Sequence, residues 1–126
     1  MDIVSLANKL AKIASVKNTA ANEYEIVTGA KINSKTPIKI FLIESEGSIK
    51  FSDKKSTLKY MNQLYELKAP DVKNCISAVI KLYGFSIVSG ELLATLRSES
   101  SLKEVFYNYI ICVGQLANMY AFFDKP

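Results

Sequence analysis

The stretch from Lys50 to Thr57 holds residue types that could bind an anion. It reads Lys-Phe-Ser-Asp-Lys-Lys-Ser-Thr, and its pattern predicts the end of a strand followed by the start of a helix. A helix N-terminus presents free backbone N–H groups and a partial positive charge, and both favour phosphate and other anions. The candidate contacts for an anion or a nucleic acid are the lysines of this region, Lys50, Lys54, Lys55 and Lys59.

A structural interpretation of the same stretch is simpler. Ser52, Asp53 or Ser56 could cap the predicted helix through a side-chain oxygen, and the lysines could keep the strand edge soluble. Lysine is also poorly placed for the dipole at a helix N-terminus, which prefers acidic groups. We therefore favour the capping interpretation and keep anion binding as the alternative.

The composition gives little support to catalysis. The chain has no histidine, which removes the usual general base, histidine-based zinc sites and the Ser-His and Cys-His nucleophile pairs. Its glycines are isolated, so it has no glycine-rich phosphate loop. A metal-dependent nuclease would need carboxylates at adjoining strand ends beside a lysine, and Glu44, Glu46 and Lys50 lack that spacing. We expect no catalytic residue, no cofactor and no metal ligand.

The net charge of +4 invites a nucleic-acid interpretation, but the kind of positive charge argues against it. Arg97 is the only arginine, and every other cation is a lysine. Direct reading of bases favours arginine, asparagine and glutamine, whereas scattered lysines are typical of solvated surfaces. We therefore rank nucleic acid below protein as a partner.

The segment from Val105 to Phe123 carries no charged residue, in a chain that is 22% charged. On a helix, polar residues form one stripe and apolar residues fill the broad opposite side. This pattern is typical of a helix packed on a globular core, and it disfavours a membrane span. Some residues lie in or beside the polar stripe and could meet a partner or a second copy. These candidate interface residues are Tyr107, Ile111, Gly114, Asn118 and Phe122.

The remaining periodicity predicts the elements that position these residues. Apolar spacing predicts helices over 2–16, 56–67, 71–83 and from residue 102 onward, with Asp71 as one N-cap and Ser100 or Ser101, with Glu104, as another. Alternation predicts strands over 23–32, 38–44, 49–51, 85–88 and 92–96, with a loop over 17–22. The order α-βββ-αα-ββ-α predicts an α+β protein with a single domain over 1–126. We expect an antiparallel sheet of about five strands with helices mainly on one face.

The N-terminus and the cysteines favour a cytoplasmic protein. Asp2, Lys9 and Lys12 do not fit a signal peptide, which needs a basic start and an unbroken apolar run. Cys75 and Cys112 lie among apolar residues in predicted helices, which is typical of buried free thiols in a reducing compartment.

Several short motifs are similar to a known pattern. They are Ile49-Lys50-Phe51-Ser52-Asp53, Leu82-Tyr83-Gly84, Gly90-Glu91-Leu92 and the apolar segment after Ser101. Through them, the region over residues 37–123 resembles an uncharacterised bacterial and prophage family known only as a domain of unknown function. Lys55 stands where that pattern has glycine. The resemblance implies a bacterial or mobile-element origin, with a role in phage–host or defence biology, and it implies no activity.

The sequence therefore favours a small non-catalytic interaction protein. It would act through a protein-binding surface, with a protein partner or a second copy bound at the C-terminal helix or at a sheet edge. The alternative is nucleic-acid or anion binding through the basic strand–helix turn from Lys50 to Lys59.

Overall fold

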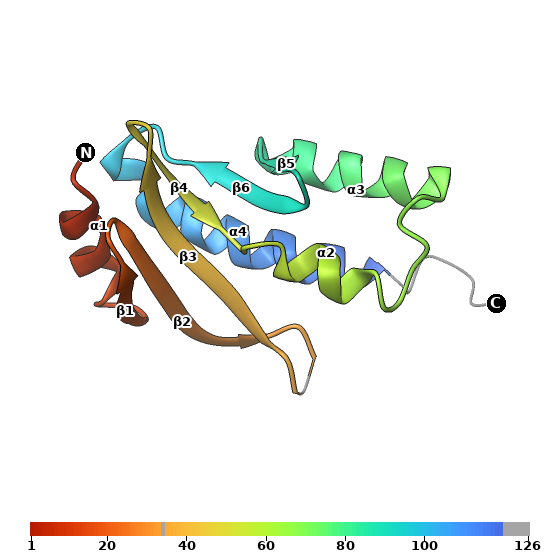
Figure 1. The fold of residues 1–126 in the computed structure, drawn as a ribbon, viewed down its shortest axis with the longest axis horizontal. Helices are drawn as coiled ribbons and strands as arrows, with labels where there is room; N and C mark the ends of the chain where they lie inside the picture. The colour runs from red at the N-terminus through yellow and green to blue at the C-terminus, as the bar shows by residue number, and fades with distance from the viewer. Residues whose placement is uncertain (34, 120–126) are drawn as a thin grey trace.

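The computed structural model describes residues 1–33 and 35–119 and shows an α+β fold (Figure 1). Within these residues, the strands form one antiparallel sheet in the order β1-β2-β3-β4-β6-β5. The elements in chain order are α1 (Ile3–Leu10), β1 (Ser15–Ala20), β2 (Glu23–Lys31), β3 (Pro37–Ser45), β4 (Ser48–Ser52), α2 (Ser56–Met61), α3 (Pro70–Tyr83), β5 (Ser86–Val88), β6 (Glu91–Thr95), a 3₁₀ turn (Glu99–Ser101) and α4 (Leu102–Ala117).

The sheet has six strands, where the sequence predicted about five. The additional strand is β1, which occupies most of the stretch that was predicted to be a loop. It pairs with β2 along one edge of the sheet, and Val16 is its only half-buried residue. Because its side chains are otherwise exposed, the backbone ladder with β2 holds this strand in place.

The central strands follow the predicted alternation. In β3, Ile38, Ile40 and Leu42 are buried, whereas Lys39 is exposed on the opposite face. The pairing of β2 with β3 loses its regular register between Val27 and Lys31, the stretch that contains Gly29. Gly29 has φ +80°, a conformation that L side chains rarely adopt.

The helix α4 forms the centre of the core and lies behind the sheet in Figure 1. Its buried side chains are Leu102, Phe106, Tyr109, Cys112, Val113, Leu116 and Ala117. The ring of Phe51 in β4 lies 5.7 Å from that of Phe106 and 6.0 Å from that of Tyr109, measured between centroids. The apolar face predicted for this helix therefore packs on the sheet. None of the described helices has both the length and the apolar character needed to cross a membrane.

The ends of several helices differ from the prediction. The first helix ends at Leu10 and not at residue 16, and α2 ends at Met61 and not at residue 67, which leaves Leu64 outside the helix and 40% exposed. The N-cap of α3 is Ala69 with proline at the next position, so Asp71 lies inside the first turn and is not the cap. A 3₁₀ turn precedes α4, and Ser101 makes no side-chain cap bond, so the predicted capping box is absent there.

Candidate functional site

The start of α2 is already occupied by a carboxylate of the chain itself. Asp53 is 1% exposed, and its two oxygens accept the backbone N–H groups of Lys55 at 2.9 Å and of Thr57 at 3.1 Å. These N–H groups are the ones that an anion at the helix start would have used. The N-cap of α2 is Lys55, which has a left-handed conformation and no side-chain cap bond, so none of the three predicted residues is the cap, although Asp53 still takes these N–H groups from two positions earlier.

The same carboxylate links two parts of the chain. The Leu92 N–H in β6 donates to Asp53 Oδ1 at 3.0 Å, and the hydroxyl of Tyr109 donates to the Leu92 carbonyl at 2.6 Å. Ser52, next to Asp53, donates its hydroxyl to the Glu91 carboxylate. The Ser52-Asp53 and Gly90-Glu91-Leu92 motifs therefore lie against each other, and their polar groups serve the packing of β4, β6 and α4.

Burial near Asp53 suppresses the ionisation of its neighbours. Burial, followed by the negative charge of Asp53, raises the pKa of the Cys112 thiol to about 12. The same two causes raise the pKa of Tyr109 far above its ordinary value. Since the thiolate is the nucleophilic form of cysteine, Cys112 stays protonated and unreactive at neutral pH. The polar groups around Asp53 therefore stabilise the fold through their hydrogen bonds.

The four lysines predicted as anion contacts do not share one surface. Lys54 Nζ is 2.8 Å from the Glu23 carboxylate and 4.4 Å from the centroid of the Phe41 ring, so it lies across β3. Hydrogen bonds from Lys54 and Thr19 lower the pKa of Glu23. Lys50 is a half-buried residue of β4, and the Lys55 side chain lies beside Gly90.

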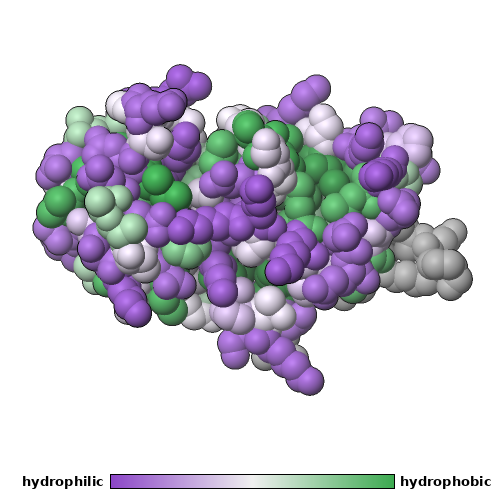
Figure 2. All heavy atoms as spheres, viewed as in Figure 1, coloured by the Kyte–Doolittle hydropathy of each residue, from purple (hydrophilic) through white to green (hydrophobic). Residues whose placement is uncertain are grey.

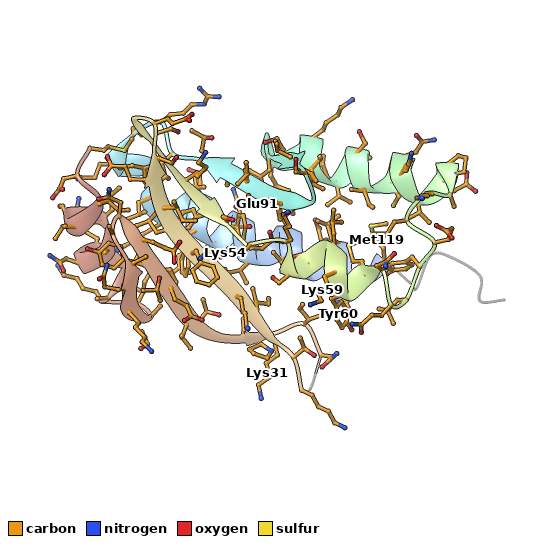
Figure 3. The ribbon with its side chains drawn as sticks, viewed as in Figure 1. Lys31, Lys54, Lys59, Tyr60, Glu91 and Met119 are labelled. Atoms are coloured by element: carbon orange, nitrogen blue, oxygen red, sulfur yellow. The ribbon has the colours of Figure 1, made fainter. Side chains whose placement is uncertain are left out.

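Lys59 points elsewhere, into a hollow between α2 and the connection from β2 to β3. Figure 3 shows Lys59 and Tyr60 on the side of α2 that faces this connection. Two further lysines line the hollow, Lys35 and Lys39. Neither lysine was predicted from the sequence, although Asn33 ahead of Pro37 is a turn signal at this place.

The predicted interface residues of α4 lie along its outer side. Tyr107 is 48% exposed and Ile111 is 50% exposed. Ile111, Gly114 and Asn118 come together in an open groove of about 530 Å³ between α3 and α4. The fifth candidate, Phe122, falls outside the described residues. The α3 side of this groove, which the sequence did not predict as an interface, consists of Cys75, Val79 and Leu82.

The helix α3 is only partly packed. Val72 is its one fully buried residue, and Leu82 is 77% exposed. The other apolar residues of its inner side are half-buried: Cys75, Ile76, Val79, Ile80 and Tyr83. Figure 2 shows hydrophobic atoms gathered at the surface between the places of α2 and α3 in Figure 1. The helix therefore leaves apolar area uncovered on the protein surface.

No grouping of acidic residues and cysteines that could hold a metal ion occurs within residues 1–33 and 35–119. Of the carboxylates weighed for a nuclease, Glu44 lies within β3, whereas Glu46 lies at an exposed turn with φ +54°. Comparisons with known protein families, with curated proteins and with solved structures found no match. The resemblance of residues 37–123 to a prophage family therefore stays a prediction.

Proposed function

We propose that this chain is a non-catalytic interaction protein whose working surface is the groove between α3 and α4. The observation that carries the proposal is the incomplete burial of α3, an amphipathic helix with an apolar side that its own fold only half covers. A large exposed apolar patch on a small protein is typical of a protein-binding surface.

The occupant that best fits this groove is a second copy of the chain. None of the described residues that line the groove is charged, although the chain carries a net charge of +4. Two copies that meet through an uncharged face keep their lysines apart and in solvent. A partner chosen for opposite charge would instead need a basic face.

The shape of the groove also fits self-association. Leu82 projects from one side with 77% of its area exposed, and a side chain at Gly114 on the other side would meet nothing within 4 Å. A projection and a hollow on the same patch are what a two-fold symmetric interface requires, because each copy offers both. The Leu82 side chain of one copy would enter the space beside Gly114 of the other.

The polar residues of the groove are already engaged within the chain. The Gln115 side-chain oxygen accepts the Tyr83 hydroxyl at 2.7 Å, and the Asn118 side-chain nitrogen donates to the Gly114 carbonyl at 2.7 Å. An apolar surface that covers the groove leaves these two hydrogen bonds intact. Burying these paired groups therefore costs less free energy than burying unpaired ones would. A cytoplasmic location fits the two free cysteines, and a bacterial or phage origin with a role in phage–host or defence biology follows from the resemblance.

The test compares Ile111→Glu with Val4→Glu in sedimentation experiments over a wide range of concentrations. Ile111 and Val4 are equally exposed, at 50% and 51%, but Val4 lies on α1. We expect a dimer for the natural chain and for Val4→Glu, and a monomer for Ile111→Glu. A natural chain that stays monomeric at high concentration overturns the proposal.

A second variant separates the interface from folding. Gly114→Ala meets no atom of its own chain within 4 Å, and alanine favours a helix by about 1 kcal/mol over glycine. We expect the monomer to become more stable while the dimer weakens, because the added methyl group fills the space for Leu82. A variant that dimerises as well as the natural chain places the contact elsewhere.

A further inference from the structure

The hollow between α2 and the β2–β3 connection brings together positive charge from three places in the chain. Lys35 lies in the connection, Lys39 in β3 and Lys59 in α2. No acidic residue is among the described residues that line the hollow. None of the three lysines forms an ion pair with another described residue. Three lysines therefore line a concave space to which the described residues contribute no counter-charge.

The connection on one side of the hollow is held by Asn33. Its side-chain oxygen accepts the backbone N–H groups of Lys35 at 2.8 Å and of Thr36 at 2.9 Å. The Ile32 N–H also donates to the Thr36 carbonyl at 2.7 Å. These bonds hold the backbone of Lys35 and Thr36 next to Asn33, so this lysine is anchored at its backbone before any ligand arrives.

Tyr60 adds a neutral donor to the hollow. Since the oxygen of Asn33 is used by the turn, its side-chain nitrogen donates to the Tyr60 hydroxyl, at 3.0 Å. The phenol oxygen thus acts as the acceptor in this bond, and its own proton has no partner among the described residues. A half-buried hydroxyl with a free proton would donate to an oxygen of an anion.

We propose that this hollow binds a small ligand with adjacent phosphate groups, such as a nucleoside triphosphate or pyrophosphate. Lysine is a common phosphate ligand, and three ammonium groups match the several negative charges of a polyphosphate better than the single charge of a carboxylate. The volume of about 660 Å³ suits a small molecule. Ser56, the first residue of α2, also lines the hollow, but Asp53 already accepts the backbone N–H groups of Lys55 and Thr57, so the proposed site does not use them.

The experiment measures binding of adenosine triphosphate and of pyrophosphate by calorimetry at low salt. The test variant replaces Lys35, Lys39 and Lys59 with glutamine. The control variant replaces Lys17, Lys68 and Lys73, three exposed lysines away from the hollow, and so removes the same charge. We expect the test variant to bind at least about tenfold more weakly, and the control to stay within about twofold of the natural chain.

Tyr60→Phe tests the hydroxyl alone. We expect its binding affinity to fall by only a few fold, because one neutral donor is removed. Circular dichroism checks that each variant is folded. An equal loss in the two triple variants would show a general attraction to positive charge and overturns the proposal, as does the absence of binding. Tighter binding of a single-stranded oligonucleotide than of the triphosphate, lost in the same test variant, would also overturn it in favour of a nucleic-acid backbone.

Discussion

The backbone N–H of Leu92 donates a hydrogen bond of 3.0 Å to the carboxylate of Asp53, which lies 39 positions earlier in the chain. The Leu92 carbonyl is bound from the other direction by the hydroxyl of Tyr109. Leu92 itself is 1% exposed, so water does not satisfy these backbone groups. Side chains from β4–α2 and from α4 therefore complete the bonding of β6 next to the end of β4.

Replacing Asp53 should destabilise the fold strongly. Asp53→Ala leaves the N–H groups of Lys55, Thr57 and Leu92 without their acceptor, and each buried unsatisfied group costs about 1–3 kcal/mol. We expect a loss of about 3 kcal/mol or more in the free energy of unfolding, measured with urea. Asp71→Ala, at an exposed position in α3, is the control and should cost less than about 1 kcal/mol. Equal losses would show that the Asp53 contacts contribute little.

Glycine at position 55 should stabilise the protein. Lys55 has φ +72°, a left-handed conformation that is costly for residues with a Cβ atom. Part of the relief is lost to the greater freedom of glycine in the unfolded chain, so we expect a net gain of about 0.5–1 kcal/mol. Lys55→Ala removes the same charge but keeps the Cβ atom, and thermal unfolding should show no such gain for it. An equal effect of both substitutions would assign the change to charge.

The carboxyl group of Glu23 should titrate differently once Lys54 is removed. Hydrogen bonds from Lys54 and Thr19 hold the pKa of Glu23 below its ordinary value of 4.5 in the folded state. The stabilisation is thus present above pH 4.5 and is lost as the pH falls through the lowered pKa. For a pair near the surface it amounts to less than about 1 kcal/mol.

Lys54→Met should therefore raise the pKa of Glu23 toward 4.5 in a carboxyl NMR titration. Lys17→Met removes a lysine from the edge strand β1 and should leave the Glu23 titration unchanged. If both variants shift it alike, the cause is the general field of the protein rather than the contact with Lys54.

Alkaline conditions should destabilise the fold through Cys112. In the unfolded chain this thiol loses its proton near pH 9.0, whereas burial raises the pKa to about 12 in the folded state. Above pH 9 the unfolded state binds fewer protons, so the free energy of unfolding falls as pH rises, with a limiting slope of about 1.4 kcal/mol per pH unit.

Urea unfolding of Cys112→Ala between pH 9 and 10 is the measurement for this effect. The variant should show a shallower fall with pH, whatever its stability at neutral pH. Cys75→Ala is the matched control, because Cys75 is half-buried, and it should keep more of the slope. An unchanged slope in Cys112→Ala would show that this thiol ionises freely in the folded protein.

The features that were predicted best from the sequence are those that depend on a local pattern of apolar and polar residues. The apolar side of α4 and the alternation of Ile38, Ile40 and Leu42 gave the layers correctly, because burial follows from period and polarity. The predicted helix over 71–83 also ends where expected, and Gly84 follows it in the left-handed conformation.

The missed features depend on residues that are distant in the chain. Strand β1 has almost no apolar periodicity, so only its pairing with β2 reveals it. Asp53 was a capping candidate, but its bond to Leu92 required the fold to bring β4 and β6 together. The hollow is likewise assembled by the turn at Asn33 and by α2, and Lys35 and Lys39 have no local signal that connects them with Lys59.

Because α4 lies at the centre of the core, we expect the fold to be completed late during synthesis. The ribosome makes all six described strands before it reaches residue 102, where α4 begins. Until then Phe51 and its neighbours on the inner side of the sheet have no aromatic rings of α4 to pack on. We therefore expect the nascent chain to expose this apolar side of the sheet until α4 has been made, a state that chaperones and proteases can recognise.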